Sequence, residues 1–239
     1  MAPSDFVDIW SVRLDRPDAL FRRLETALSA DERQRASRFV LDRDRRRFVE
    51  RRAALRTILG SYLALSPADV VLVRDAKGKP LLAASNGAPS LCFNTSHSAH
   101  WAVVAVAHNR AVGVDVEKIR RLPDIYSVAQ RFFSPGEIAV LDRLDGHERL
   151  VAFFNCWTRK EAYIKARGEG LSMPLDAFDV SLAPGEPAAL LRNHVDETDV
   201  ARWEMRSIPV AAGYVAAMVV EGHEWKLKTF SLEPPAFDA

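Results

Sequence analysis

A carboxylate, an ammonium group and an aromatic ring share one face of a predicted helix at residues 157–167. Trp157, Glu161 and Lys165 are spaced at i, i+4 and i+8, which places their side chains on the same side of a helix. Residues that end helices follow, namely Gly168, Gly170 and Pro174. A Glu beside a Lys is suited to acid–base chemistry. The alternative interpretation is an ordinary surface Glu–Lys pair of small energy.

Two further carboxylates are predicted on one face of a strand at residues 112–117. Alternation directs its valines to the core and places Asp115 and Glu117 on the other face, roughly 6.5 to 7 Å apart. The β-prone run 101–107 precedes this strand, and the residues between them are numerous enough for a hairpin turn. Such oxygen ligands suit Mg²⁺, with Glu161 as the third carboxylate. The alternative is the solvated face of an amphipathic hairpin.

The segment 93–98, Phe-Asn-Thr-Ser-His-Ser, is polar and compact between two apolar strands. We expect a loop there that presents the hydroxyl of Ser96 and the imidazole of His97 to a ligand. Because a lone histidine is more often structural than functional, this segment alone predicts no reaction.

The chain contains four motifs in a fixed order: Phe-Asn-x-Ser-His at 93–97, Gly-Val-Asp-Val-Glu at 113–117, Arg-Phe-Phe-Ser-Pro-x-Glu at 131–137 and the helix motif at 157–171. This order and spacing resemble the 4′-phosphopantetheinyl transferases of the surfactin-synthetase-activating type, over about residues 30–180. The resemblance implies an α+β fold of two similar halves related by a pseudo-twofold axis, with the ligand in the cleft between them.

The function implied by the resemblance is that of a Mg²⁺-dependent transferase. It would move the 4′-phosphopantetheine group from coenzyme A to the acceptor serine of an apo acyl or peptidyl carrier protein and release 3′,5′-ADP. Asp115, Glu117 and Glu161 would hold Mg²⁺, or Mn²⁺ as a substitute, and Asp115 would also contact coenzyme A. The sequence does not identify the carrier, because polyketide, peptide and fatty-acid synthase carriers share the acceptor serine.

Residues 31–56 contain ten arginines against five acidic residues, and apolar residues recur there at helical spacing. We interpret this segment as a basic amphipathic helix, most of whose charges fit a solvated face. By the resemblance, Arg47 and the Gly-Lys-Pro turn with Lys79 bind the 3′-phosphate end of coenzyme A. Upstream the match is weaker, since Arg35 corresponds less clearly and Glu32 stands where a second base is expected.

Contacts to the diphosphate of coenzyme A also follow from the resemblance. Lys165 would meet a phosphate from one half, and Ser96 and His97 would do so from the other half. Lys160 lies around the helix from Lys165, so it would approach the diphosphate from a neighbouring angle or form a salt bridge instead.

The base that takes the serine proton has two candidates. The family supports Glu161, acting directly or through a metal-bound water, and Glu137 is the other candidate. A structural role is the alternative for Glu137, because Ser-Pro-Gly-Glu at 134–137 has the form of a capping box with Pro at the first helical position.

A basic segment at 118–121, Lys-Ile-Arg-Arg, directly follows Glu117. Carrier domains present an acidic helix beside their serine, as a property of the family's partners. We therefore expect Arg120 and Arg121 to steer the carrier toward the cleft, and the alternative is a solvated loop.

Composition limits the other functions. The 239 residues carry 33 Lys and Arg against 32 Asp and Glu, which gives no overall case for a nucleic-acid or membrane partner. The longest apolar stretch, 210–220, is too short to span a bilayer, and residues 1–10 lack a signal-peptide pattern. We expect a cytoplasmic monomer in which Cys92 and Cys156 are reduced core thiols.

Two other function classes stay open. A nucleic-acid-binding module would use the arginines of 31–56, although the near-neutral charge and the lack of interleaved aromatic residues argue against it. A Mg²⁺-dependent phosphohydrolase acting on a nucleotide would share the three carboxylates. Incubation with coenzyme A and Mg²⁺ separates the enzymes, because only a hydrolase releases 3′,5′-ADP without a carrier.

We divide the chain near Ala111 into an N-terminal half, residues 1–110, with the 3′-phosphate-binding helix, and a C-terminal half, residues 111–239, with the metal-binding acids. A faint internal similarity supports two related halves. Residues 51–60 resemble 159–168, and the strand-like run 101–107 has a counterpart at 214–220.

Overall fold

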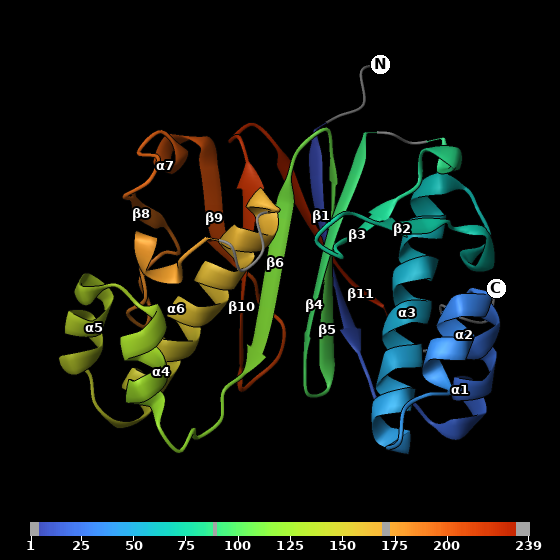
Figure 1. The fold of residues 1–239 in the computed structure, drawn as a ribbon, viewed down its shortest axis with the longest axis horizontal. Helices are drawn as coiled ribbons and strands as arrows, with labels where there is room; N and C mark the ends of the chain where they lie inside the picture. The colour runs from blue at the N-terminus through green and yellow to red at the C-terminus, as the bar shows by residue number, and fades with distance from the viewer. Residues whose placement is uncertain (1–4, 88–89, 169–172, 233–239) are drawn as a thin grey trace.

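The computed structural model describes residues 5–87, 90–168 and 173–232. Its elements stack in the order helices, sheet, sheet, helices (Figure 1). The first sheet has the order β11-β1-β5-β4, formed by Lys226–Leu232, Phe6–Arg13, Trp101–His108 and Leu91–Ser98. Its outer face carries α1 (Asp18–Leu24), α2 (Ala30–Ala36), α3 (Asp42–Leu63) and the hairpin of β2 (Leu72–Arg74) and β3 (Pro80–Leu82).

The second sheet has the order β6-β10-β9, formed by Val112–Lys118, Tyr214–Glu221 and Trp203–Ser207. Around it lie α4 (Ile125–Phe132), α5 (Pro135–Asp142), α6 (Gly146–Arg167), α7 (Asp199–Arg202) and the pair β7 (Phe178–Val180) and β8 (Leu190–Asn193). Short 3-10 helices lie at Glu25–Ala27, Pro67–Asp69, Ala84–Asn86 and Leu175–Ala177. This architecture confirms the predicted α+β class.

Three apolar layers hold the stack together. The alternation predicted for β6 is confirmed, because Val112, Val114 and Val116 are buried between the two sheets, in one cluster with residues of β1, β5 and β10. The outer face of the first sheet packs on α3 and that of the second sheet on α6. The helices α3 and α6 each have 22 residues, so each half consists of a sheet covered by one long helix.

Two expectations for the strands are wrong. Residues 101–107 and 112–117 form no hairpin, because β5 pairs with β1 and β4, whereas β6 pairs with β10 in the other sheet. Residues 93–98 form no loop either, since they are the end of β4, in register with β5 from Leu91↔His108 to Ser98↔Trp101. The polar residues of this strand fit because their side chains bond to groups of β6.

The basic segment 31–56 is not one helix. It is divided between α2 and α3, and the intervening residues lie outside both helices. A capping box in which Ser29 and Glu32 bond reciprocally starts α2. Phe39, in the intervening segment, packs on Phe48 of α3 with ring centroids 5.3 Å apart, which anchors the break.

The C-terminal strand crosses the predicted division of the chain. β11 runs parallel to β1 and so completes the sheet of the first half; the boundary near Ala111 itself stays a prediction. Cys156 is buried and Cys92 half-buried, both as free thiols. In the described part of the chain, no helix is long and apolar enough to cross a membrane.

Candidate active site

A polar cluster forms where β4, β6 and the end of α6 meet. Asp115 of β6 is 5% exposed, and its Oδ1 accepts hydrogen bonds from Ser96 Oγ and Lys165 Nζ, each at 2.6 Å. Its Oδ2 is buried and has no hydrogen-bond partner among the residues that the structure describes. Burial raises the pKa of Asp115, and the charge of Lys165 opposes that shift. The structure therefore brings together three residues predicted for the site, with one carboxylate oxygen left over.

Gly113 allows this cluster to form. A Cβ atom at this position would lie 2.1 Å from the carbonyl oxygen of Ala162 and 2.3 Å from the backbone nitrogen of Ala166. A side chain there would therefore push α6 away from β6. The close approach of helix and strand brings the ammonium of Lys165 to Asp115.

The other two predicted metal ligands, Glu117 and Glu161, lie close enough to Asp115 for their charges to interact. Glu117 Oε2 accepts hydrogen bonds from Ser98 Oγ at 2.7 Å and from Arg120 Nη1 at 3.2 Å. Glu161 has a raised pKa, first because of burial and then because of the charges of Asp115 and Glu117. Within residues 5–87, 90–168 and 173–232, however, no group of three or more His, Cys, Asp or Glu side chains is arranged to hold a metal ion. The carboxylates instead use Ser, Lys and Arg partners.

An arginine-lined cavity of about 240 Å³ adjoins Ser96 and His97. Its arginines come from α2, α3 and β2, namely Arg35, Arg51, Arg52 and Arg74. Arg51 Nη1 lies 2.8 Å from His97 Nδ1, and the other charges that act on the pKa of Arg51 are all arginines. Desolvation and these neighbours lower the pKa of Arg51 to about 10. The cavity is thus electropositive, as an anion-binding site requires.

His97 is neutral in this setting. Although its side chain keeps an exposed edge, desolvation and the charges of Arg51 and Lys165 lower its pKa to about 4. A neutral imidazole accepts the hydrogen bond from Arg51. The negative charge of a bound phosphate would oppose the positive charges of Arg51 and Lys165. It would therefore raise the pKa of His97 and favour the protonated ring.

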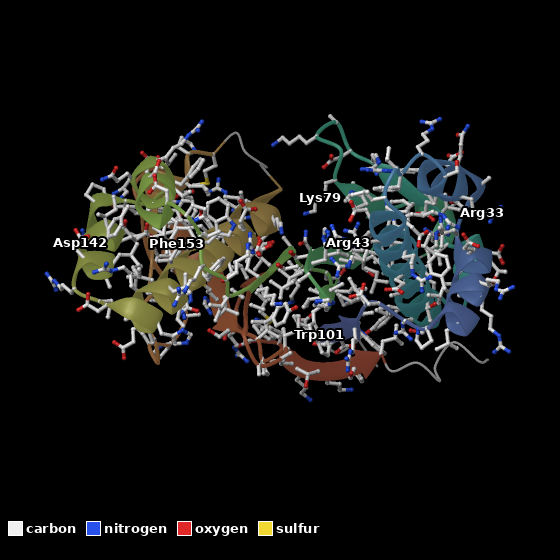
Figure 2. All side chains as sticks on the ribbon, turned by 90° about the horizontal axis from the view of Figure 1, so that it is seen from below. Arg33, Arg43, Lys79, Trp101, Asp142 and Phe153 are labelled. Atoms are coloured by element: carbon white, nitrogen blue, oxygen red, sulfur yellow. The ribbon has the colours of Figure 1, made fainter. Side chains whose placement is uncertain are left out.

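Arg47 and Lys79 lie in two neighbouring cavities. Arg47 lines one of about 530 Å³ together with Arg51 and His97, and it binds Asp15 through Nε at 3.0 Å and Nη2 at 3.1 Å. Lys79 lines another of about 310 Å³ and donates from Nζ to the carbonyl of Lys165 at 2.8 Å. Figure 2 labels Lys79, which lies between the two halves.

Lys160 and Glu137 take the structural alternatives predicted for them, a salt bridge and a capping box. Lys160 is 0% exposed; its Nζ donates to the carbonyls of Leu175 at 2.7 Å and Phe178 at 2.5 Å and pairs with Glu137 at 2.8 Å. Glu137 also accepts from the backbone nitrogens of Ser134 and Val180, and the predicted capping box is confirmed. Both groups are buried with these partners, so their predicted contacts with the diphosphate and the serine have no support in this structure.

Glu32, which stands where the family resemblance predicts a basic residue, has a structural role. It is buried, closes the capping box of α2, and pairs with Arg56 at 2.5 Å and Arg52 at 3.4 Å. The carboxylate thus joins α2 to α3. Arg52 keeps a local counter-charge, whereas Arg51 faces the cavity beside His97.

The sequence predictions missed Arg51, Arg52 and Arg74. One signal was available for Arg51, because it lies four residues after Arg47 and shares its helix face. For Arg74 the sequence offers no comparable signal, since a separate hairpin carries it to the cavity. The predicted helix end at Gly168 is confirmed by its left-handed conformation, φ 70°, while Gly170 lies outside the described residues.

Comparison with known proteins agrees with the motif pattern. The family model of the 4′-phosphopantetheinyl transferase superfamily matches residues 111–219, and that of the 4′-phosphopantetheinyl transferase N-terminal region matches 16–109. The 4′-phosphopantetheinyl transferase HetI of Nostoc sp. is 39% identical, covering 94% of this chain and 92% of that protein. The 4′-phosphopantetheinyl transferase Sfp of Bacillus subtilis is 33% identical over 73% of this chain and 76% of its own. The Thermotoga maritima holo-[acyl-carrier-protein] synthase structure aligns with TM-score 0.37 at 22% identity, over 46% of this chain and 62% of its own.

Proposed function

The chain belongs to the 4′-phosphopantetheinyl transferase superfamily, and from this premise we propose the reaction that its cleft performs. The enzyme transfers 4′-phosphopantetheine from coenzyme A to the acceptor serine of an apo carrier protein, in the presence of Mg²⁺, and releases 3′,5′-ADP. The observation that carries this proposal is the pair of buried Asp115 with half-buried Lys165 beside a cavity lined by four arginines, with Ser96 belonging to both.

Coenzyme A is a polyanion, and the cleft matches its charges. We propose that the arginine-lined cavity and the neighbouring cavity of Arg47, which share Arg51 and His97, take the adenosine 3′-phosphate end, with Arg47 and Arg51 as its main partners. Ser96, His97 and Lys165 then meet the diphosphate. Arginine suits this task because its guanidinium bonds phosphate oxygens in pairs.

The chemistry of the carboxylates near Asp115 supports Mg²⁺ as the ion, although the three side chains do not converge on one point in the ligand-free protein. Asp115 Oδ2 is buried without a partner among the described residues, and Asp115 and Glu117 both raise the pKa of Glu161, as carboxylates that share a site do. Asp115, Glu117 and Glu161 would hold the ion. When bound, Mg²⁺ would neutralise charge on the diphosphate and the leaving group. Lys165 compensates the charge of Asp115 in the ligand-free protein.

Glu161 is the proposed base. Without a bound ion, burial and the charges of Asp115 and Glu117 raise its pKa, and a raised pKa makes a carboxylate a stronger base. The serine oxygen forms a bond to the phosphorus that carries pantetheine while its proton passes to Glu161. The bond from that phosphorus to the bridging oxygen breaks, and the electron pair stays with 3′,5′-ADP, whose charge Lys165 stabilises.

Arg47→Ala should raise KM for coenzyme A and change KM for 3′-dephospho-coenzyme A much less. The lost charge-assisted contact is worth about 1.5 to 3 kcal/mol, and only when its phosphate is present. Steady-state kinetics with both substrates measures the difference, and Arg51→Ala is tested in parallel. Equal losses on both substrates would show that Arg47 is structural through its pair with Asp15.

Arg121→Glu should lower kcat/KM for the carrier and flatten its salt dependence, with KM for coenzyme A unchanged. Steering of an acidic partner acts on the association rate and weakens with salt. Arg121 is preferred to Arg120, because Arg120 bonds Glu117, a proposed metal ligand. The exposed Arg143 supplies a control, since Arg143→Glu alters net charge equally. An unaltered salt slope in Arg121→Glu would place the docking surface elsewhere.

The direct test of function is a mass-spectrometric screen of apo carrier domains incubated with coenzyme A and Mg²⁺. Gain of one phosphopantetheine arm and release of 3′,5′-ADP only with a carrier would support the proposal, whereas 3′,5′-ADP release without a carrier would indicate a hydrolase. The carriers modified would also test the surfactin-synthetase-activating subtype. The monomeric state and the cytoplasmic location remain part of the proposal.

A further inference from the structure

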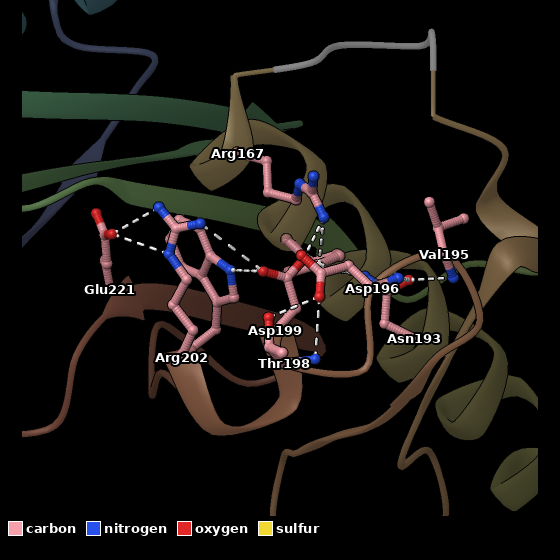
Figure 3. A network of polar contacts seen from close by, with 10 residues as sticks. Arg167, Asn193, Val195, Asp196, Thr198, Asp199, Arg202 and Glu221 are labelled. Carbon is pink, nitrogen blue, oxygen red and sulfur yellow. Dashed lines mark hydrogen bonds and ion pairs between the residues drawn. The ribbon is translucent and has the colours of Figure 1, made fainter.

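A second polar network lies on the other side of α6 (Figure 3). Its centre is Asp199, the first residue of α7, which is 0% exposed. The carboxylate accepts hydrogen bonds from Tyr163 Oη at 2.5 Å, Asn193 Nδ2 at 3.0 Å and Trp203 Nε1 at 3.1 Å, and it pairs with Arg167. Four elements of the C-terminal half, α6, β8, α7 and β9, therefore meet at one buried carboxylate.

Two of these partners belong to the last turns of α6. Tyr163 and Arg167 are four residues apart and lie on one face of the helix. Glu161 and Lys165 each precede one of them by two residues, which is a rotation of about 200° at 3.6 residues per turn. The network thus holds the face of α6 that points away from the proposed catalytic groups.

The closest contact of α6 with β6 is made by small residues. It consists of Gly113 against the backbone of Ala162 and Ala166. Packing between such small residues sets the distance between strand and helix. The bonds of Tyr163 and Arg167 to Asp199 are directional, so they orient the last two turns of the helix, as the bonds of Lys160 orient the turn before them.

We propose that Asp199 is a positioning residue, which holds the last two turns of α6 through Tyr163 and Arg167 so that Glu161 and Lys165 face Asp115. This inference rests on the proposed function, in which Glu161 and Lys165 act on the serine and the diphosphate. Asp199 touches neither substrate nor reacting atoms. Its loss should therefore change kcat more than the affinity for coenzyme A, because the arginines at the proposed 3′-phosphate end are not carried by α6.

Asp199→Asn keeps the size of the side chain and removes its charge. We expect kcat to fall about ten- to a hundred-fold, since misplacement of catalytic groups by about 1 Å has effects of this size, while KM for coenzyme A changes less than about twofold. Arg167→Met and Tyr163→Phe should each lower kcat. In the double variant Asp199→Asn/Arg167→Met, the effects should not multiply, because both changes break the same link.

Asp8 provides a matched control in the other half. It is a buried aspartate that accepts a hydrogen bond from a tyrosine, Tyr62, at 2.6 Å, like Asp199 with Tyr163. Asp8→Asn should not alter kcat, measured at a temperature well below the unfolding of every variant. If Asp199→Asn does not fold, Arg167→Met and Tyr163→Phe are judged by the same criteria.

Three results would overturn the inference: wild-type kcat in folded Asp199→Asn, an equal loss of kcat in Asp8→Asn, or a loss confined to KM. The wild-type protein is assayed first with coenzyme A and apo carrier. Failure there would refute the proposed function, whereas an active wild type with an equally active Asp199→Asn variant would refute only the positioning role.

Discussion

Asp115→Ala is expected to lower kcat by a factor of about 100 to 1000, the size of effect seen when one preorganised electrostatic group is removed from an active site. The change removes a proposed metal ligand and leaves Lys165 without its partner at the diphosphate. Stability should not fall with activity. The Lys165 side chain is 28% exposed, so water can solvate its charge once the carboxylate is removed, and the Tm should change little.

The measurement combines kcat at saturating Mg²⁺, calorimetric Mg²⁺ binding in the presence of coenzyme A, and thermal unfolding. Glu137→Gln should show the opposite pattern, a loss of stability without a loss of turnover. It breaks a pair whose Lys160 is 0% exposed, and loss of one partner of a buried pair costs about 3 to 5 kcal/mol. The folded fraction should retain its turnover. Full activity in Asp115→Ala would end the metal assignment, and a catalytic defect in stable Glu137→Gln would restore Glu137 as a candidate base.

Gly113→Ala is expected to damage both stability and turnover. The added Cβ would meet backbone atoms of α6 at 2.1 and 2.3 Å, and backbone cannot move aside as a side-chain tip can. Overpacking of this kind costs about 1 to 3 kcal/mol, and more where the backbone must shift. Because α6 carries Lys165 and Glu161, its displacement should also separate Lys165 from Asp115 and lower kcat in the molecules that stay folded.

Gly136→Ala is the matched control, because a Cβ there would have Ser134 Oγ at 3.7 Å as its nearest neighbour, an ordinary contact. Denaturant unfolding and kcat are measured for both variants. If Gly113→Ala were as stable and as active as Gly136→Ala, the close approach of β6 and α6 would not be what positions the site.

Local patterns predicted the parts of the site whose geometry is set within one element. The alternation of β6 placed Asp115 opposite the core valines, and the order Ser-Pro-Gly-Glu identified the capping box at the start of α5. The spacing of Glu161 and Lys165 put them on one face of α6. Each prediction depends on residues only a few positions apart, so the backbone period is enough to decide it.

The alternation of residues within a strand does not show which other strands pair with it. An apolar strand such as β5 fits equally beside several neighbours, and the structure pairs it with β1 and β4 rather than with the next strand along the chain. For the same reason the polar end of β4 was mistaken for a loop: its side chains find their partners on β6, about 20 residues away, only when the two sheets meet.

The sequence by itself determined the family, the α+β class and the helix and strand faces that carry Asp115, Glu161 and Lys165, because motif order and backbone period are properties of the chain. Only the tertiary structure decided which charged groups are used elsewhere. It buried Lys160 with Glu137, engaged Glu32 with Arg56, and joined arginines of three separate elements at one cavity. The sequence does not show which group will pair with a given charged side chain. Burying an unpaired charge costs free energy, so each buried charge acquires its partner when the chain folds.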